Sequence, residues 1–250
     1  MECEVKKKYY PSGSLQRETY FLNGVRHREN GPAIIEYYEN GGIRFVNYYI
    51  NNKMHREDGP AYIFYFLNGA VSTKQYSING KVHREDGPAT ISYNSTGGIN
   101  EESYWLDDKM HREDGPACIS YDDGAVFCEE YRIRGILHRK NKPAYIYYYK
   151  NGTIESEQYY INGKCHREDG PAKIKYNRDG NINLKQYTIN NVVYNDKYEQ
   201  YSKNLTSKII NSINDKDELI LCKIICIEKQ YKHLLGLVES KLIAYQLEGK

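Results

Sequence analysis

Apolar and other residues alternate along short stretches of this chain, and each stretch is followed by a turn that contains glycine. The clearest stretch reads Ala-x-Ile-x-Tyr. Because successive side chains of a strand point to opposite faces of a sheet, this two-residue period predicts a short β-strand. A second stretch ending in Tyr-x-Ile follows each turn, which is the pattern of a β-hairpin. The first strand occurs as Ala33/Ile35/Tyr37, Ala61/Ile63/Tyr65, Ala89/Ile91/Tyr93, Ala117/Ile119/Tyr121, Ala144/Ile146/Tyr148 and Ala172/Ile174/Tyr176.

The hairpins recur at a fixed period. Aligned on a histidine, the units are spaced 28, 28, 28, 27 and 28 residues apart, and Tyr194 stands where a seventh histidine is due. A constant period of this length indicates a repeat array whose units contact mainly their neighbours. We therefore expect about seven 28-residue hairpins over residues 1–194, forming an all-β array: an elongated, solenoid-like antiparallel meander.

Residues 195–250 have a different composition, which predicts a C-terminal α-helical cap. Asp196 is expected to cap a first helix that extends to Ile213, and Asn214 to start a second. Apolar residues at steps of three or four from Ile220 to Tyr245 predict one long amphipathic helix. A repeat array needs an end with a different outer face, so folding back onto the last hairpin is the expected role. Formation of a homo-oligomer through residues 214–247 is the alternative.

The connectors between hairpins read HREDGPA or a close variant, and their structural interpretation explains each residue locally. Asp is expected to accept bonds from backbone amides, Gly to permit positive φ, and Pro to fix φ. Arg and Glu are expected to pair between adjacent repeats, and His to pack on Tyr while bonding a carbonyl. The residues assigned to this structural motif are His27, His55, His83, His111, His138, His166, Arg56, Arg84, Arg112 and Arg167.

Two chemical interpretations of the connectors are less favoured. Like residues lie two strands apart, about 10 Å, which is too far to share a metal ion. Six near-equal copies describe periodicity and not one asymmetric catalytic site, and the fifth copy, HRKNKPA, replaces Glu, Asp and Gly with Lys140, Asn141 and Lys142. We therefore predict no enzyme, no catalytic residue, no metal site and no cofactor.

The positions between the repeated Ala, Ile and Tyr define a second face, which is aromatic in repeats two and five. An exposed aromatic strip is a candidate contact surface for a partner protein, unless the sheet curls or the C-terminal segment covers it. No stripe of Lys or Arg follows these residues in the sequence, so stacking of nucleobases is not expected. The candidate partner-binding residues are Tyr62, Phe64, Phe66, Tyr145, Tyr147 and Tyr149.

Charge and cysteine content limit the partners and the cellular location that we expect. The 35 basic and 33 acidic side chains nearly cancel, so no nucleic acid is expected as a partner. No apolar run reaches the roughly 18 residues of a spanning helix, the N-terminus lacks the apolar core of a signal peptide, and membrane contact is not expected. The six cysteines lack CxxC spacing, which favours reduced thiols and an intracellular, cytoplasmic location.

The hairpins with NG turns, a spaced Tyr and a following NGK resemble MORN-type (membrane occupation and recognition nexus) repeats over residues 5–194. The likeness is to the longer variants with HREDGPA connectors, as in giant-virus and bacterial proteins, whereas common MORN units are shorter and richer in Gly and Trp. The resemblance implies a non-enzymatic scaffold that mediates protein–protein interaction. An amino-acid composition rich in Lys, Asn, Ile and Tyr is typical of an AT-rich genome. It suits a viral source, with the host cytoplasm or the virion as the location.

Two other functions stay open. A structural or assembly protein of a virion or filament is one alternative, and a ligand-binding or hydrolytic protein with one repeat-derived groove is the other.

Overall fold

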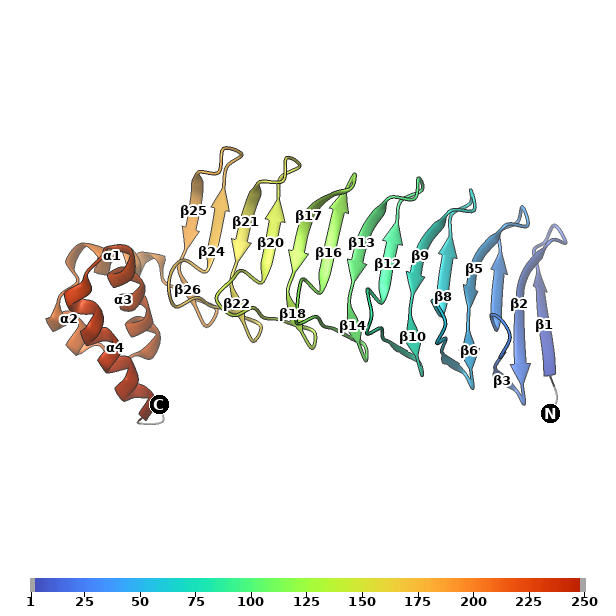
Figure 1. Ribbon diagram of the computed structural model, residues 1–250, viewed down its shortest axis with the longest axis horizontal. Coiled ribbons are helices and arrows are strands. Elements are labelled where there is room, and N and C mark those ends of the chain that lie inside the picture. The colour runs from blue at the N-terminus through green and yellow to red at the C-terminus, as the bar shows by residue number, and fades with distance from the viewer. Residues whose placement is uncertain (1–2, 248–250) are drawn as a thin grey trace. The chain divides into compact units, whose positions relative to one another are not determined.

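The structure, a computed structural model, describes residues 3–247, and the chain comprises two compact units, residues 1–135 and 136–250. Each unit contains antiparallel hairpins in chain order, and the second also contains all the helices of the described residues (Figure 1). The strands end at Val193 and the first helix begins at Asn195. The fold class expected from the sequence, a β-hairpin meander with a C-terminal helical segment, is therefore confirmed.

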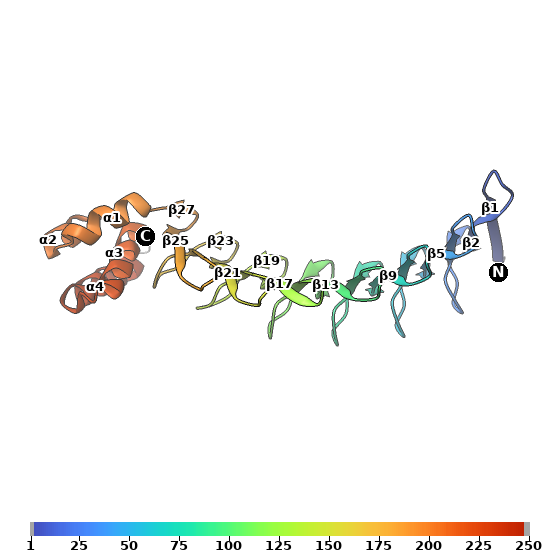
Figure 2. The ribbon, with the colours of Figure 1, turned by 90° about the horizontal axis from the view of Figure 1, so that it is seen from above.

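The long strands of the first unit form an antiparallel meander in which each strand pairs with the next long strand of the chain (Figures 1 and 2). Pairing of neighbours only is what a repeat array requires. In order, these strands are β1 (Cys3–Tyr9), β2 (Leu15–Leu22), β4 (Ile34–Tyr37), β5 (Ile43–Asn47), β8 (Tyr62–Tyr65), β9 (Val71–Gln75), β12 (Thr90–Tyr93), β13 (Ile99–Ser103), β16 (Cys118–Asp122) and β17 (Ala125–Glu130).

Two-residue strands follow each long hairpin and lie close to the connector. In the first unit these are β3 (Val25–Arg26), β6 (Tyr49–Ile50), β7 (Lys53–Met54), β10 (Ser77–Ile78), β11 (Lys81–Val82), β14 (Trp105–Leu106), β15 (Lys109–Met110) and β18 (Arg132–Ile133). Asn79 and Gly80, between β10 and β11, both have positive φ (53° and 88°). Two consecutive positive φ angles are the signature of a tight hairpin turn, which explains the recurring ING.

Neighbouring repeats are also joined beside the connectors. The amide of Arg56 donates to the carbonyl of Ser77 in the next repeat (3.1 Å), and the amide of Gly80 donates back to Met54 (2.8 Å). The same pair of bonds recurs where the amide of Arg84 donates to Trp105 and that of Asp108 to Val82. Backbone bonds thus tie each repeat to the next at two levels, in the long strands and beside the connector.

The first strand of the sheet, β1, pairs only with β2 and presents a row of lysines, Lys6, Lys7 and Lys8. All three are exposed. Lys7 lies 3.2 Å from the carboxylate of Glu18 on β2, whose bond raises the pKa of the lysine. This edge of the sheet is therefore charged.

The second unit continues the same pattern and then changes to helix. Its strands are β19 (Ile136–Leu137), β20 (Tyr145–Tyr148), β21 (Ile154–Gln158), β22 (Tyr160–Ile161), β23 (Lys164–Cys165), β24 (Lys173–Tyr176), β25 (Ile182–Gln186), β26 (Thr188–Ile189) and β27 (Val192–Val193). Its helices are α1 (Asn195–Asn204), α2 (Ser207–Ser212), α3 (Lys216–Glu228) and α4 (Lys232–Leu247).

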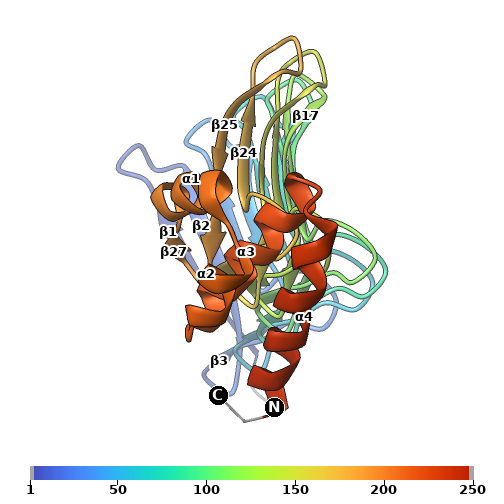
Figure 3. The ribbon, with the colours of Figure 1, turned by 90° about the vertical axis from the view of Figure 1, so that its left-hand side faces the viewer.

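The helices pack on the last hairpin of the second unit. Helix α3 contacts α1, α4 and β26 (Figure 3). Tyr187 and Ile189 of the hairpin belong to one buried cluster with the apolar face of the helices. The ring of Tyr187 stacks on Tyr198 at a centroid distance of 3.8 Å, and both hydroxyls donate to Glu228. The end of the array is therefore covered by a small helical core.

Both helices expected from the sequence are divided in two. The first breaks because Leu205 is extended (φ −65°, ψ 122°) and Thr206 caps α2, its side chain accepting from the amide of Ile209. The expected cap residue Asp196 does not cap α1, which begins without a side-chain cap bond. The long helix breaks at Gln230, whose φ of 59° is left-handed. The two unbroken helices were wrongly expected because local backbone reversals that lack Gly or Pro leave no mark on apolar spacing. Asp196 was wrongly expected as a cap because α1 begins one residue earlier, at Asn195.

The start of α3 provides a test of these assignments. Asp215 accepts a bond from the amide of Glu218 (2.8 Å), and replacing such a cap with Ala costs roughly 1 kcal/mol. We therefore expect Asp215→Ala to lower the free energy of unfolding by about that amount, and Asp196→Ala, the matched control, by less than about 0.5 kcal/mol. Urea denaturation followed by far-UV circular dichroism measures both, and an equal loss in the two variants would contradict the assignment.

Candidate functional site

The connectors, residues 27–33, 55–61, 83–89, 111–117, 138–144 and 166–172, are organised around their arginines. In five connectors the guanidinium lies over the ring of the tyrosine eight residues earlier, at 3.8–4.1 Å from the ring centroid. Guanidinium Nη1 also donates to the carbonyl of the connector proline, at 3.2 Å in the first connector. Cation–π contact and hydrogen bond together hold the connector against the sheet. The alanine that ends each connector is fully buried.

The connector aspartate pairs with the arginine of its own repeat. Arg56 Nε donates to Asp58 (2.7 Å), and the same bond joins Arg84 to Asp86, Arg112 to Asp114 and Arg167 to Asp169. The expectation that Arg pairs between repeats was wrong, because the guanidinium bonds the Asp two residues later in its own connector. A backbone amide also contributes a hydrogen bond at Asp58, Asp86 and Asp114, as expected.

The bond from arginine, and the charge behind it, hold the pKa of Asp58, Asp86 and Asp114 below its usual value of 3.8. A carboxylate with a lowered pKa in the folded state adds stability above the unfolded pKa, and that contribution is lost as pH falls through the folded pKa.

The connector glycine leaves room for this arginine. A Cβ at Gly115 would lie 2.9 Å from Cζ of Arg112, and one at Gly59 would lie 3.1 Å from Cζ of Arg56. Among the five connector glycines, Gly31 alone has positive φ (143°). The expectation that Gly serves positive φ was therefore wrong for the other four, where glycine is required by close contact with the guanidinium.

The connector histidine joins one repeat to the next. Nδ1 of His55 accepts from the amide of Asn79, in the turn of the following repeat, at 3.1 Å. The equivalent bonds of His27, His111, His138 and His166 measure 3.1–3.3 Å. An Nδ1 that accepts leaves the proton on Nε2, which faces the connector Glu at 3.3–3.7 Å where that Glu is present. The predicted bond to a carbonyl has a counterpart in the first connector, where Nδ1 of His27 lies 2.9 Å from Oδ1 of Asn51. At His55, His111, His138 and His166 the partner is instead a backbone amide.

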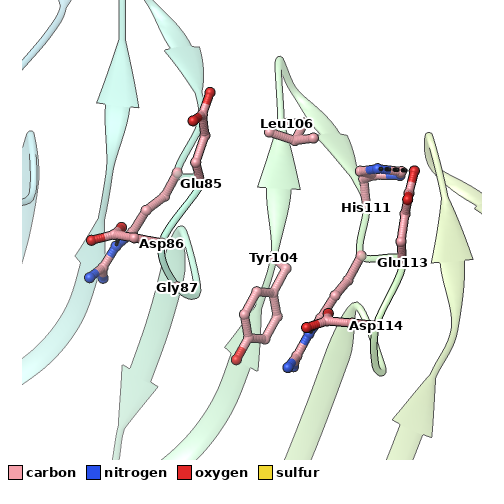
Figure 4. A pocket seen from close by; sticks show the side chains of 10 residues that line it. Glu85, Asp86, Gly87, Tyr104, Leu106, His111, Glu113 and Asp114 are labelled. Carbon is pink, nitrogen blue, oxygen red and sulfur yellow. Dashed lines mark hydrogen bonds and ion pairs between the residues drawn. The ribbon is translucent and has the colours of Figure 1, made fainter.

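Consecutive connectors enclose grooves. In the first unit one groove, of about 480 Å³, lies between the third and fourth connectors, with Tyr104 and Leu106 between them (Figure 4). An equivalent groove of about 380 Å³ lies between the second and third connectors. Each collects one histidine and four acids from two repeats. Because the same set recurs, it is not one asymmetric site.

No group of three His, Cys, Asp or Glu side chains between residues 3 and 247 has the geometry to hold a metal ion. The thiols of Cys118, Cys165, Cys222 and Cys226 are buried, and burial raises their pKa, to about 12 for Cys118 and Cys222 and about 11 for Cys226. A buried thiol with a raised pKa is a poor nucleophile. The side chain of Cys3 lies outside the part of the chain that the structure describes.

The aromatic residues predicted in repeat two lie on one stretch of sheet. Tyr62 and Phe64 are on β8, and Phe66 is in the turn that follows it. Phe45 of β5 stands directly opposite Phe64, and its ring centroid lies 6.0 Å from that of Tyr62. All three predicted residues are half-buried. We call Tyr62, Phe64, Phe66 and Phe45 the aromatic patch.

Basic side chains interleave with this patch, contrary to expectation. Arg44 lies 6.0 Å from the rings of both Tyr38 and Phe64, and Arg17 lies 5.9 Å from that of Phe45. Both arginines bond the carboxylate of Glu36, at 2.5 Å and 3.2 Å, and Glu36 is only 4% exposed. The sequence does not show this triad because cross-strand pairing brings the residues together. One buried glutamate compensates part of the positive charge.

The aromatic residues predicted in repeat five lie in the second unit. Tyr145 and Tyr147 on β20 meet edge to face at 4.9 Å, with their hydroxyls 2.7 Å apart. Tyr149 donates its hydroxyl to the carbonyl of Tyr176 in the next repeat (2.9 Å). Tyr38 donates the equivalent bond to the carbonyl of Tyr65 (2.6 Å). Tyr149 therefore has a structural role in the repeat, in addition to the predicted role in partner binding.

Comparison of the chain with family models and with curated proteins finds no match to either. No helix within residues 3–247 has the length and apolar character needed to cross a bilayer.

The contact between arginine and glycine gives a testable consequence. We expect Gly115→Ala to lower the free energy of unfolding by about 1–3 kcal/mol, since the added methyl overlaps Arg112. In an Arg112→Ala background the same substitution should cost less than about 0.5 kcal/mol, because the obstacle is gone.

Gly236→Ala in α4 is the control, since a Cβ there meets no atom within 4 Å and should add about 0.5–1 kcal/mol of stability. Urea unfolding of the four variants measures these values. A cost at Gly115 that persists without Arg112 would contradict the assignment.

Proposed function

We propose that the chain is a non-enzymatic, MORN-like repeat scaffold that mediates protein–protein interaction. The observation that carries this proposal is the use of the connector side chains. The histidines bond turns of the next repeat and the arginines stack on tyrosines and pair with aspartates. The residue types suited to catalysis thus form a repeated framework, which supports a binding role over a hydrolytic one.

The partner-binding surface that we favour is the aromatic patch. Half-buried aromatic side chains interleaved with arginine are the composition that protein interfaces enrich. The third repeat has Thr90 and Ser92 at the corresponding positions and the fourth has Cys118 and Ser120, so the patch differs from the repeats that follow it in the first unit.

A second candidate function, a structural or assembly protein that oligomerises through its C-terminal helices, has a separate observation in its favour. Ile243 and Leu247 of α4 are 57% and 84% exposed, and Ile227 of α3 is 39% exposed. Apolar side chains on the outer face of a small helical core are available to a second copy.

An intracellular location, in a cytoplasm or a virion, forms part of the proposal. Buried residues Cys118, Cys165, Cys222 and Cys226 are present as thiols, which agrees with a reducing compartment. The viral source rests on the composition of the chain alone.

Cross-linking mass spectrometry of proteins captured from the native cell tests the proposal. We expect the triple variant Tyr62→Ser, Phe64→Ser, Phe66→Ser to lose at least about tenfold of the cross-linked partner, because aromatic side chains dominate interface energies. The matched control, Thr90→Ala with Ser92→Ala, changes the same face one repeat later and should capture the partner at the wild-type level.

Melting curves must show that both variants stay folded. Equal capture by the folded triple variant would remove the patch as the contact site. Light scattering tests the second candidate function, assembly through the C-terminal helices. That function requires the wild-type chain to have the mass of a dimer and the variant Ile243→Ser to have the mass of a monomer.

A further inference from the structure

The fifth connector reverses the charge of the repeat. Where four connectors have Glu, Asp and Gly, and the first has Glu29, Asn30 and Gly31, this one has Lys140, Asn141 and Lys142. A connector with HREDG carries one positive and two negative charges, whereas HRKNK carries three positive charges and none negative. The difference is four charges, and the backbone differs too, because Asn141 has a left-handed φ of 59° that the aspartates at this position do not share.

This substitution changes the groove between the fifth and sixth connectors, in the second unit. The groove has a volume of about 420 Å³ and is bordered by Lys140 and Asn141 on one connector, Glu168 and Asp169 on the other, and Lys223 of α3. Tyr159 and Ile161 supply apolar lining. The volume is in the range of pockets that hold a few side chains or a small ligand.

The sign of the groove is opposite to that of its equivalents. Four cationic side chains and two acids line it, a net charge of +2 with histidines neutral: Arg139, Lys140, Arg167, Lys223, Glu168 and Asp169. The two grooves described in the first unit each have two arginines and four acids, a net charge of −2. The fold therefore presents one shape with two electrostatic characters.

Several charged side chains of the groove already contact groups of opposite charge, whereas Lys140 contacts none among the described residues. Arg167 donates to Asp169 (2.6 Å) and stacks on Tyr159 (4.0 Å). Glu168 lies 3.3 Å from His166, and this bond, with Lys223 and Lys216 nearby, holds the pKa of Glu168 below its usual value. Within the described residues Lys140 forms no hydrogen bond or ion pair, and it is exposed. An anion that entered the groove would meet Lys140 and Lys223 from two sides.

We propose that this groove binds a short acidic peptide segment of a partner protein, with Asp or Glu carboxylates at Lys140 and Lys223 and an apolar side chain on Tyr159 and Ile161. The inference rests on the proposed function and names its partner chemistry. A peptide fits better than nucleic acid, because the basic side chains border a single groove and the whole chain has a net charge of only +2. The negative grooves repel the same segment, so specificity comes from repulsion elsewhere as well as attraction here.

The test uses the full chain and a fluorescein-labelled peptide of about eight residues, alternating Glu and Asp around a central Tyr. Fluorescence anisotropy should show one binding site whose affinity falls with salt. The same peptide with Gln and Asn in place of the acids should bind at least about tenfold more weakly.

The matched variant restores the common connector: Lys140→Glu, Asn141→Asp and Lys142→Gly together. It returns a sequence that the fold already accommodates, so folding is retained, and it should weaken binding of the acidic peptide at least about tenfold. The converse variant, Glu85→Lys with Asp86→Asn, changes both grooves that border the third connector, each from −2 to +1, and should raise the number of bound peptides above one.

Several outcomes would overturn the inference: no binding by the folded wild type, unchanged binding by the restored connector, or tighter binding of an oligothymidylate of equal charge. These failures are separable from failure of the proposed function. A wild-type chain that ignores the acidic peptide but still loses its cellular partner on substitution of Tyr62, Phe64 and Phe66 keeps its scaffold role without this groove.

Discussion

The arginine stacked on tyrosine is the contact on which each repeat depends. The guanidinium sits about 4 Å from the ring, bonds the proline carbonyl and pairs with the aspartate, so a single side chain fixes the path of seven residues. The guanidinium leaves no room for a side chain at the connector glycine. The connector that the arginine holds in place buries the alanine at its end. A sheet one layer thick has little core of its own, and this clamp replaces part of what a second layer would supply.

Because most repeats share the same framework contacts, the positions outside that framework are free to differ in chemistry. The aromatic patch and the positive groove are both local departures from the repeat, and at the groove the backbone changes as well, at Asn141. The patch exchanges small polar residues for aromatic ones between neighbouring strands, and the groove exchanges acids for lysines within one connector. In this architecture we expect partner recognition at positions that depart from the repeat pattern. The positions that keep the pattern are the ones that support the fold.

Strand alternation, the 28-residue period and the NG turns were sufficient to predict the hairpins, since all three depend on residues close in sequence. The pairing of Arg, and the role of Gly at four of its five positions, were not predicted correctly. His55 bonds an amide 24 residues later, and Arg17 meets a glutamate 19 residues later, so both contacts require the strand register.

The helix breaks at Leu205 and Gln230 were not predicted from the sequence, for a different reason. Apolar spacing reports which face is buried and is nearly unchanged when a helix stops and restarts on the same side. Candidate contact residues could be named from alternation alone, whereas their arginine neighbours could not.

The lysine row on β1 has a consequence for how long such an array can become. Strands that end a sheet carry unsatisfied backbone donors and acceptors, and a hairpin of another molecule could extend the ladder there. The lysines oppose that docking when an incoming copy brings the same strand against them, although Glu4 and Glu18 offset part of the charge of Lys6 and Lys7. Addition of a second copy at this margin is thus disfavoured.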